Sequence, residues 1–195
     1  MPAVLGLSVA LGYAVAALLR GLPMRAAVPI AAAAILVRLV YAQQHDPFAI
    51  QTYPSYAVYD RLAREPGRFT LLEVPFGVRS GLERIGQGGE VLEYYQHVHG
   101  KPLLNGMIAR LPDSVFAEYA AHPSLVLLSG GEVDEQGLQQ DLTDVLDWTA
   151  TRYVLVHASL LDAEQTTRVL PLLDTHPRLQ RLDQELDLVV YAVRE

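Results

Sequence analysis

Two long apolar blocks of the chain lie before residue 43. Residues 3–19 contain no charged side chain, and residues 26–42 are interrupted only by Arg38. A helix that crosses the hydrocarbon core of a bilayer needs about 17 to 25 mainly apolar residues, and both blocks lie at the lower end of that range. The connection at 20–25 contains Gly and Pro, which favour a turn. The pattern therefore predicts a transmembrane helical hairpin over residues 1–42.

The arginines of the hairpin predict its orientation. Arg20 and Arg25 flank the short connection, and positively charged loops of membrane proteins tend to stay in the cytoplasm. We therefore expect a multi-pass protein of the cell membrane whose C-terminal domain is extracytoplasmic. Two alternatives stay open. One is an Ala-rich helical pair buried in a soluble core, and the other is a processed signal peptide, although the chain lacks the basic start typical of a signal peptide.

After a polar linker at 43–54, short apolar stretches alternate with polar turns over residues 55–195. Apolar residues at helical spacing predict helices, and short apolar runs between turn signals predict strands. The predicted helices lie at 55–65, 90–98, 112–121, 134–151 and 162–175, and the predicted strands at 69–74, 124–128, 153–157, 179–182 and 186–193. We expect residues 77–89 to form a loop and 101–111 to be irregular or weakly extended. The alternation predicts an α/β fold, a layered domain with a mixed sheet in which the last two strands are antiparallel.

The charge of the chain is as unevenly distributed as its hydropathy. All 22 acidic residues and 12 of the 15 basic residues follow residue 42, which gives residues 43–195 a formal charge of −10. An acidic domain disfavours nucleic acid as a partner, because nucleic acid requires a basic surface. The chain has no cysteine, which excludes disulfides, thiol catalysis and thiolate metal sites. The lipid bilayer is the expected partner of the N-terminal hairpin.

Polar side chains that suit sugar recognition are concentrated between residues 90 and 110. Tyrosines offer stacking faces, and amides and cations bind hydroxyl and phosphate groups. Glu73 lies at the end of a predicted strand, and strand ends in α/β sheets commonly face a ligand crevice. We therefore predict a ligand-binding crevice that is lined by Glu73, Tyr95, His97, His99, Lys101, Asn105 and Arg110. In the alternative interpretation, Lys101-Pro102 shapes a turn and the histidines cap neighbouring backbone.

Motifs for metals and cofactors are weak. His97 and His99 would share a face only on a strand, and spacing places no third ligand, so no metal site is predicted. The glycine-rich stretch 77–89 matches neither a P-loop nor a dinucleotide fingerprint. No cofactor is therefore predicted.

The sequence identifies no catalytic residue. Glu73 with Glu90 or Glu93 could form a hydrolytic carboxylate pair, but solvated or ion-paired acids are the commoner arrangement. His157, at the end of a predicted strand, has a catalytic and a structural interpretation, and hydrogen-bonded structural histidines are more frequent at such positions.

Several segments, taken in order, resemble a known family. They are Asp60-Arg61-Leu62, Leu72-Glu73-Val74-Pro75, residues 95–102 (YQHVHGKP), Asn105-Gly106, 109–112 (ARLP), 152–157 (RYVLVH) and 189–193 (VVYAV). The set resembles the C-terminal extracytoplasmic region of bacterial polytopic membrane proteins described as GT-C-like glycosyltransferases or uncharacterised membrane proteins. The similarity covers most of residues 24–195, and its most specific part is His99-Gly100-Lys101-Pro102.

The resemblance implies a function. Such proteins use a lipid-phosphate-linked sugar donor, so the implied partner is a polyprenyl-phosphate sugar or a polytopic membrane subunit. Their catalytic acid usually lies in an early extracytoplasmic loop, and no residue of this chain corresponds to it. The expectation is a membrane-anchored accessory or substrate-binding domain that is not an enzyme as an isolated chain. It would be a truncated gene product, a split subunit or a free-standing relative of the glycosyltransferases. One alternative is a structural or interaction module of a membrane complex without a sugar role. Another is an independent hydrolase that uses Glu73 and a histidine.

Overall fold

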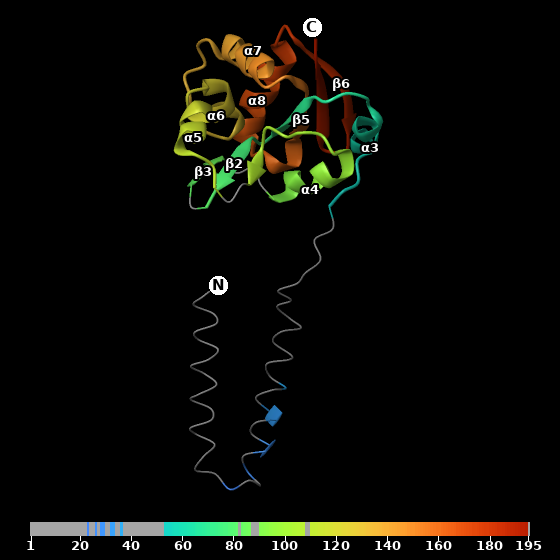
Figure 1. Ribbon diagram of the computed structural model, residues 1–195, viewed down its shortest axis with the longest axis vertical. Helices are drawn as coiled ribbons and strands as arrows, with labels where there is room; N and C mark the ends of the chain where they lie inside the picture. Colours follow the sequence, from blue (N-terminus) through green and yellow to red (C-terminus); the bar gives the residue numbers. More distant parts are fainter. Residues whose placement is uncertain are drawn as a thin grey trace. The chain divides into compact units, whose positions relative to one another are not determined.

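The computed structural model describes residues 53–194, except for 82, 87–89 and 108–109, together with seven isolated positions between 23 and 36 (Figure 1). The chain divides into two units, residues 1–52 and 53–195. The predicted hairpin, apart from those isolated positions, and most of the predicted linker lie outside the described residues. Within the part of the chain that is described, no helix has both the length and the apolar character required to cross a membrane.

Four strands form the central sheet of the second unit. They are β1 (Thr70–Val74), β5 (Thr151–His157), β6 (Leu179–Glu185) and β7 (Leu188–Val193). Their order is β1-β5-β7-β6, with β1 parallel to β5 and the other neighbours antiparallel. The central strands β5 and β7 are rich in valine and tyrosine, which pack well on a pleated surface. The predicted α/β class, the mixed sheet and the antiparallel closing pair are confirmed.

Helices lie on both faces of the central sheet (Figure 1). In chain order they are α3 (Ala57–Arg64), α4 (Glu90–His99), α5 (Asp113–Ala120), α6 (Pro123–Leu128), α7 (Leu138–Trp148) and α8 (Ala163–Thr175), with a short 3-10 helix, η1, at Ala158–Leu160. A capping box begins α8: the Asp162 carboxylate accepts from the Gln165 N–H, and the Gln165 side chain accepts from the Asp162 N–H. These two bonds satisfy N–H groups that have no partner inside the helix, and they explain why α8 begins where the sequence predicts.

Alternate residues of β1 and β5 enter two separate cores. Leu72 faces a core formed with α6, α7 and α8, whereas Leu71 and Leu155 face a core formed with α3 and α4. Side chains alternate between the two faces of a strand. Glu73 therefore shares the face of Leu71, His157 shares the face of Leu155, and both polar side chains enter the core beneath α3 and α4.

The segment after α4 covers the free edge of β1. Leu71 donates its N–H to the Pro102 carbonyl and accepts from the Leu104 N–H, both at 2.9 Å. At Glu73 a side chain replaces the backbone partner. Asn105 Oδ1 accepts from the Glu73 N–H at 3.0 Å, and its Nδ2 donates to the Glu73 carbonyl at 2.8 Å. The backbone groups of the edge strand are thereby satisfied inside the protein.

A second, smaller sheet shows that the predicted loop at 77–89 was wrong in part. It contains β2 (Gly77–Ser80), β3 (Glu83–Gly86) and β4 (Gly106–Met107) in the order β3-β2-β4. β2 and β3 form an antiparallel hairpin in which Val78 lies opposite Ile85. Gly81 provides the turn with φ of +56°, a conformation that glycine adopts without strain. Gly81, one of the glycines that suggested a loop, therefore turns a hairpin that pairs Val78 with Ile85.

Residues 124–128, predicted as a strand, form most of the helix α6. Pro123 occupies its first turn, where the missing N–H of proline needs no partner. Four side chains of this short helix are buried, namely Ser124, Leu125, Leu127 and Leu128. A continuous apolar run does not distinguish a buried strand from a short buried helix, and proline at the first position was the overlooked signal.

Two element boundaries also differ from those predicted. α7 begins only after Gly137, which has φ of +80°, so it is shorter than the predicted helix at 134–151. β6 continues to Glu185 because Gln184 and Glu185 still pair with β7. The hairpin turn consequently lies at Leu186-Asp187, later than the gap between the predicted strands at 179–182 and 186–193.

Candidate functional site

Four polar side chains meet in the core between the central sheet, α3 and α4, and we call them the buried cluster: Tyr59, Glu73, His99 and His157. Glu73 lies near the end of β1 and His157 ends β5, so both stand at the carboxyl ends of adjacent parallel strands. Tyr59 belongs to α3, and His99 ends α4. None of the four is more than 3% exposed. The topology thus brings acid–base side chains to an edge of the sheet where α/β domains commonly bind ligands.

Three atoms of the buried cluster form a triangle of hydrogen-bond contacts. The Tyr59 hydroxyl donates to Glu73 Oε2 at 3.2 Å and lies 2.9 Å from His157 Nε2. His157 Nε2 lies 3.0 Å from the same carboxylate oxygen. With a hydrogen on His157 Nε2, Glu73 Oε2 accepts from both neighbours. The arrangement can hold a proton among a carboxyl, an imidazole and a phenol.

His99 approaches the other oxygen of Glu73 without bonding to it. His99 Nδ1 accepts from the backbone N–H of Lys101 at 3.0 Å. Its Nε2 lies 3.9 Å from Glu73 Oε1, beyond hydrogen-bond distance. Neither Nε2 nor Oε1 has a hydrogen-bond partner among the described residues. Burial, followed by the nearby charge of Lys101, lowers the pKa of His99 to about 4, so this ring is neutral at pH 7.

Burial also shifts the pKa values of Glu73 and Tyr59. Removal from water raises the pKa of Glu73, and the hydrogen bond and attraction to His157, followed by the hydrogen bond from Tyr59, offset part of that rise. Burial raises the pKa of Tyr59 as well, and the nearby charge of Glu73 adds to the effect. Tyr59 is therefore a neutral hydrogen-bond donor throughout the physiological range.

Tyrosine rings close the buried cluster on its helical side. Tyr95 of α4 stacks on Tyr59, with ring centroids 4.5 Å apart and an interplanar angle of 12°. It also stacks on His157 at 5.6 Å. Tyr56, packed edge-on against Tyr95, donates its hydroxyl to Asp187 at 2.6 Å. A substrate could reach Glu73 only after α3 or α4 had moved.

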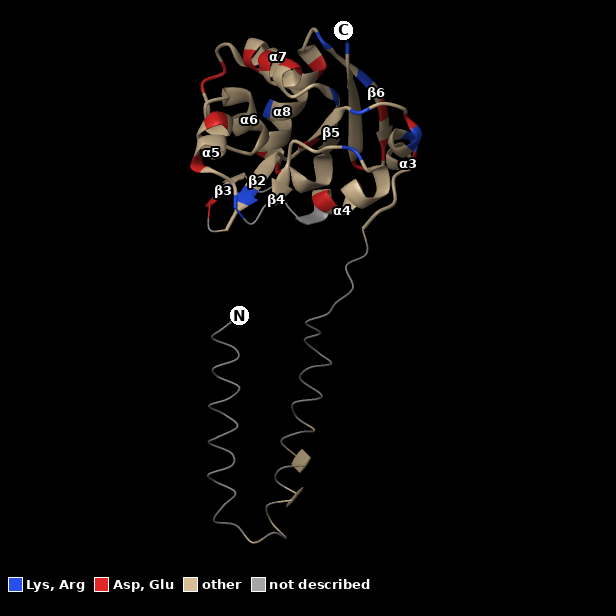
Figure 2. Cartoon of the chain, in the orientation of Figure 1, with Lys and Arg blue, Asp and Glu red and all other residues tan. Residues whose placement is uncertain are grey.

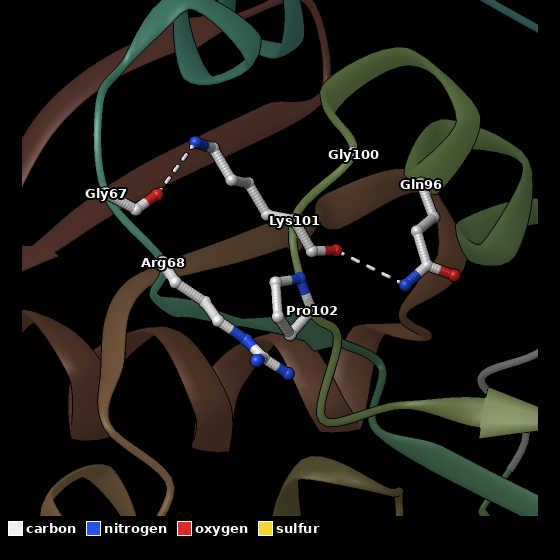
Figure 3. Close-up of a pocket in the computed structure, with 6 residues that line it drawn as sticks. All are labelled: Gly67, Arg68, Gln96, Gly100, Lys101 and Pro102. Atoms are coloured by element: carbon white, nitrogen blue, oxygen red, sulfur yellow. Dashed lines mark hydrogen bonds between the residues drawn. The ribbon is translucent and has the colours of Figure 1, made fainter.

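An open pocket of about 450 Å³ lies beside the C-terminal end of α4, and we call it the basic pocket. It is lined by Gly67, Arg68, Gln96, Gly100, Lys101 and Pro102 (Figure 3). Lys101 Nζ donates to the carbonyls of Glu65 at 2.6 Å and Gly67 at 3.2 Å. Gln96 Nε2 donates to the Lys101 carbonyl at 3.2 Å. These bonds connect the three segments that form the pocket and fix its outline.

The basic pocket carries positive charge in an otherwise acidic domain. Lys101 Nζ and the Arg152 guanidinium lie 4.6 Å and 5.2 Å from the centre of the Phe69 ring. Arg152 is paired with Glu65 at 3.0 Å, whereas Arg68 forms no ion pair or hydrogen bond with the described residues. Acidic residues mark α5 and α7, and basic residues occur near α3 and β6 (Figure 2). The pocket is thus suited to an anionic group.

The structure separates the seven predicted site residues into three places. Glu73 and His99 belong to the buried cluster, Tyr95 stacks against it, and Asn105 binds the backbone of Glu73. Lys101 lines the basic pocket. His97 and Arg110 are exposed. His97 and His99 diverge because residues two apart on a helix point about 200° away from each other, so only one of them can enter the core.

Three side chains of these sites were missing from the predicted set. Tyr59 counted only as part of the apolar face of a helix, although a buried tyrosine hydroxyl usually requires a partner. His157 was considered singly, because no sequence signal brought it beside Glu73 before the two strands were known to be parallel neighbours. Arg68 follows a helix-ending Pro66-Gly67, and nothing in its local sequence indicates a pocket.

Metal binding has no set of ligands in the described part of the chain. No group of three or more His, Asp or Glu side chains there is arranged to hold a metal ion. His99 adds a chemical reason. Its Nδ1 accepts a hydrogen bond, so the neutral ring carries its hydrogen on Nε2 and offers no free lone pair toward Glu73.

Comparisons with protein-family models, with curated proteins and with solved structures found no match to this chain.

Proposed function

We propose that this chain is a membrane-anchored accessory or substrate-binding component that binds the phosphate of a phosphorylated sugar in the basic pocket. The anchor in this proposal is a transmembrane hairpin at 1–42, supported by its two apolar blocks and basic connection. The same arginines support an extracytoplasmic position for the α/β domain. The observation that carries the binding role is the cationic pocket beside Phe69.

Local charge favours a phosphate ligand. Residues 43–195 have a formal charge of −10, so the net charge of the domain repels anions. At the basic pocket, Arg68 makes no ion pair or hydrogen bond with the described residues, and Lys101 keeps a third donor after binding the carbonyls of Glu65 and Gly67. An arginine can donate two parallel hydrogen bonds to a phosphate. The pocket therefore brings cationic donors together within a domain whose net charge is negative.

The lining of the basic pocket favours binding over catalysis. Its side chains are a guanidinium, an ammonium group and an amide, with glycine and proline as the remainder. None of these is a carboxylate or an imidazole, which are the usual general acids and bases. The carboxylate and imidazoles of the buried cluster lie apart from this lining and are shielded from solvent. A role in holding a substrate for a catalytic partner fits this separation.

The test begins with membranes that contain the full-length chain. Carbonate extraction should leave the chain in the membrane pellet, and release into the soluble fraction would refute the anchor. The protein is then purified in detergent and titrated calorimetrically with glucose 1-phosphate, with glucose and with inorganic phosphate at low ionic strength, since salt screens exposed charges. We expect saturable binding of the two phosphate compounds and none of glucose.

Arg68→Ala should weaken that binding about tenfold, equivalent to about 1.4 kcal/mol, because a charged hydrogen bond to phosphate is lost. Arg84→Ala is the matched control, since Arg84 is an exposed arginine of β3, a strand of the other sheet. Equal affinity of the two variants would refute the assignment to the basic pocket. Absence of any phosphate binding would leave the domain as an interaction module.

A further inference from the structure

Two complementary polar atoms of the buried cluster face each other without a partner. Glu73 Oε1 and His99 Nε2 are 3.9 Å apart, and both side chains have no exposed surface. Neither atom makes a hydrogen bond with the residues that the structure describes. Buried polar atoms in proteins nearly always have a partner, and a site where two are left open commonly holds an ordered water.

The backbone defines which of these atoms is the donor. The Lys101 N–H points at His99 Nδ1 at 3.0 Å, so Nδ1 must present its lone pair. The neutral ring then carries its hydrogen on Nε2, and His99 is neutral at pH 7 because burial lowers its pKa to about 4. A donor at His99 therefore faces an acceptor at Glu73. A hydroxyl group fits this pair, because it accepts and donates through one atom.

The separation of the two atoms suits a single small group. An oxygen about 2.8 Å from both atoms would see them at an angle of roughly 90°, within the range that a water molecule accommodates. A metal ion would need the Nε2 lone pair that this tautomer lacks. The ring of Tyr59, which stacks on His99 with centroids 5.4 Å apart, borders the site, so a larger ligand would have to displace packed aromatic rings.

We propose that Glu73 and His99 form a buried hydroxyl-binding site that holds one water molecule between Oε1 and the Nε2–H. With this water, the Glu73 side chain accepts hydrogen bonds at both oxygens, from Tyr59 and His157 at Oε2 and from the water at Oε1. The site goes beyond the proposed phosphate binding, because it lies in the core and uses none of the side chains that line the basic pocket.

A crystal structure of the full-length chain, with NMR of its histidine nitrogens, tests the site. We expect one ordered water about 2.8 Å from Glu73 Oε1 and His99 Nε2, and a long-range nitrogen–proton spectrum in which His99 is the Nε2–H tautomer. The Hε2 proton should also show a contact with a water that stays longer than the protein takes to tumble. His99→Gln should remove this signal, whereas His97→Gln, at an exposed position of the same helix, should leave it unchanged.

Either of two results would overturn the proposal. The first is an Nδ1–H tautomer of His99, which would turn an acceptor toward Glu73. The second is a direct hydrogen bond between Nε2 and Oε1 with no water density and no water contact of Hε2. Both results can be read from the unmodified protein, so a variant that fails to fold does not prevent the decision.

Discussion

Replacement of Asn105 by alanine should destabilise the α/β domain by more than the loss of one hydrogen bond, because the Asn105 side chain makes three. Asn105 is 7% exposed. It accepts from the Glu73 N–H at 3.0 Å and donates to the carbonyls of Glu73 at 2.8 Å and Pro75 at 3.3 Å. Each hydrogen bond contributes about 0.5–1.5 kcal/mol net, and each buried group left open costs about 1–3 kcal/mol. Because water can partly enter the space that the side chain leaves, we expect the free energy of unfolding to fall by about 2–4 kcal/mol.

The assay is chemical denaturation of the full-length chain in detergent, followed by the fluorescence of Trp148, the single tryptophan of the chain. Asn105→Asp is a more specific test. It keeps the acceptor for the Glu73 N–H but replaces the two hydrogen bonds that Asn105 donates by repulsion between the new carboxylate and the carbonyl oxygens of Glu73 and Pro75. It should be at least as destabilising as alanine. Gln136→Ala removes an exposed amide whose side chain makes no hydrogen bond in the described structure, and it should change stability by less than about 0.5 kcal/mol. A loss below about 1 kcal/mol for Asn105→Ala would refute the view that Asn105 substitutes for a neighbouring strand.

Two further variants test the packing and the electrostatics of the domain. Gly86→Ala should lower the free energy of unfolding by about 2–5 kcal/mol, because φ is +69° and the new Cβ would lie 2.2 Å from the Phe76 carbonyl oxygen. Gly67 also has a positive φ but has open space around it, so Gly67→Ala should lower the free energy of unfolding by only about 1–2 kcal/mol. Equal losses in the two variants would contradict the clash at Gly86. Folding lowers the pKa of His99 from its ordinary 6.5 to about 4. As the pH falls from 6.5 to 4, His99 is therefore protonated in the unfolded chain before it is protonated in the folded chain, and the folded state loses stability. The free energy of unfolding of the unmodified chain minus that of His99→Gln should therefore be larger at pH 6.5 than at pH 4, by up to about 3 kcal/mol. Denaturation at the two pH values measures this difference, with His97→Gln as the control. An equal difference at both pH values would disprove the prediction.

Local sequence signals were sufficient where one physical rule dominated. Residues 153–157 are an apolar run next to turn signals, and they form the buried part of β5. Asp162 has both an N-cap side chain and a glutamine three residues later, so α8 begins where capping chemistry requires. The predictions failed at 77–80, 83–86 and 124–128, where two sequence signals indicated different structures. Glycine indicated a loop although its role was a hairpin turn, and an apolar run indicated a strand although Pro123 began a helix.

The candidate site was predictable only in part, because it depends on which strands are neighbours. Glu73 was identified from its place at a strand end, and His99 from its polar surroundings. The link between Glu73 and His157 spans 84 residues and arises from parallel pairing of β1 with β5, which no local pattern indicates. The conformation of 95–105 separated His97 from His99, since a helix places neighbours two apart on opposite sides.

Lys101 joins the two candidate sites through different atoms, and this makes their roles separable. Its ammonium group belongs to the basic pocket, where it binds the carbonyls of Glu65 and Gly67. Its backbone N–H belongs to the buried cluster, where it sets the tautomer of His99. Removal of the side chain therefore takes a charge from the pocket but keeps the bond that orients His99. That bond depends only on the backbone. The turn that follows α4 therefore decides that His99 Nε2 is the donor facing Glu73, whatever ligand the basic pocket binds.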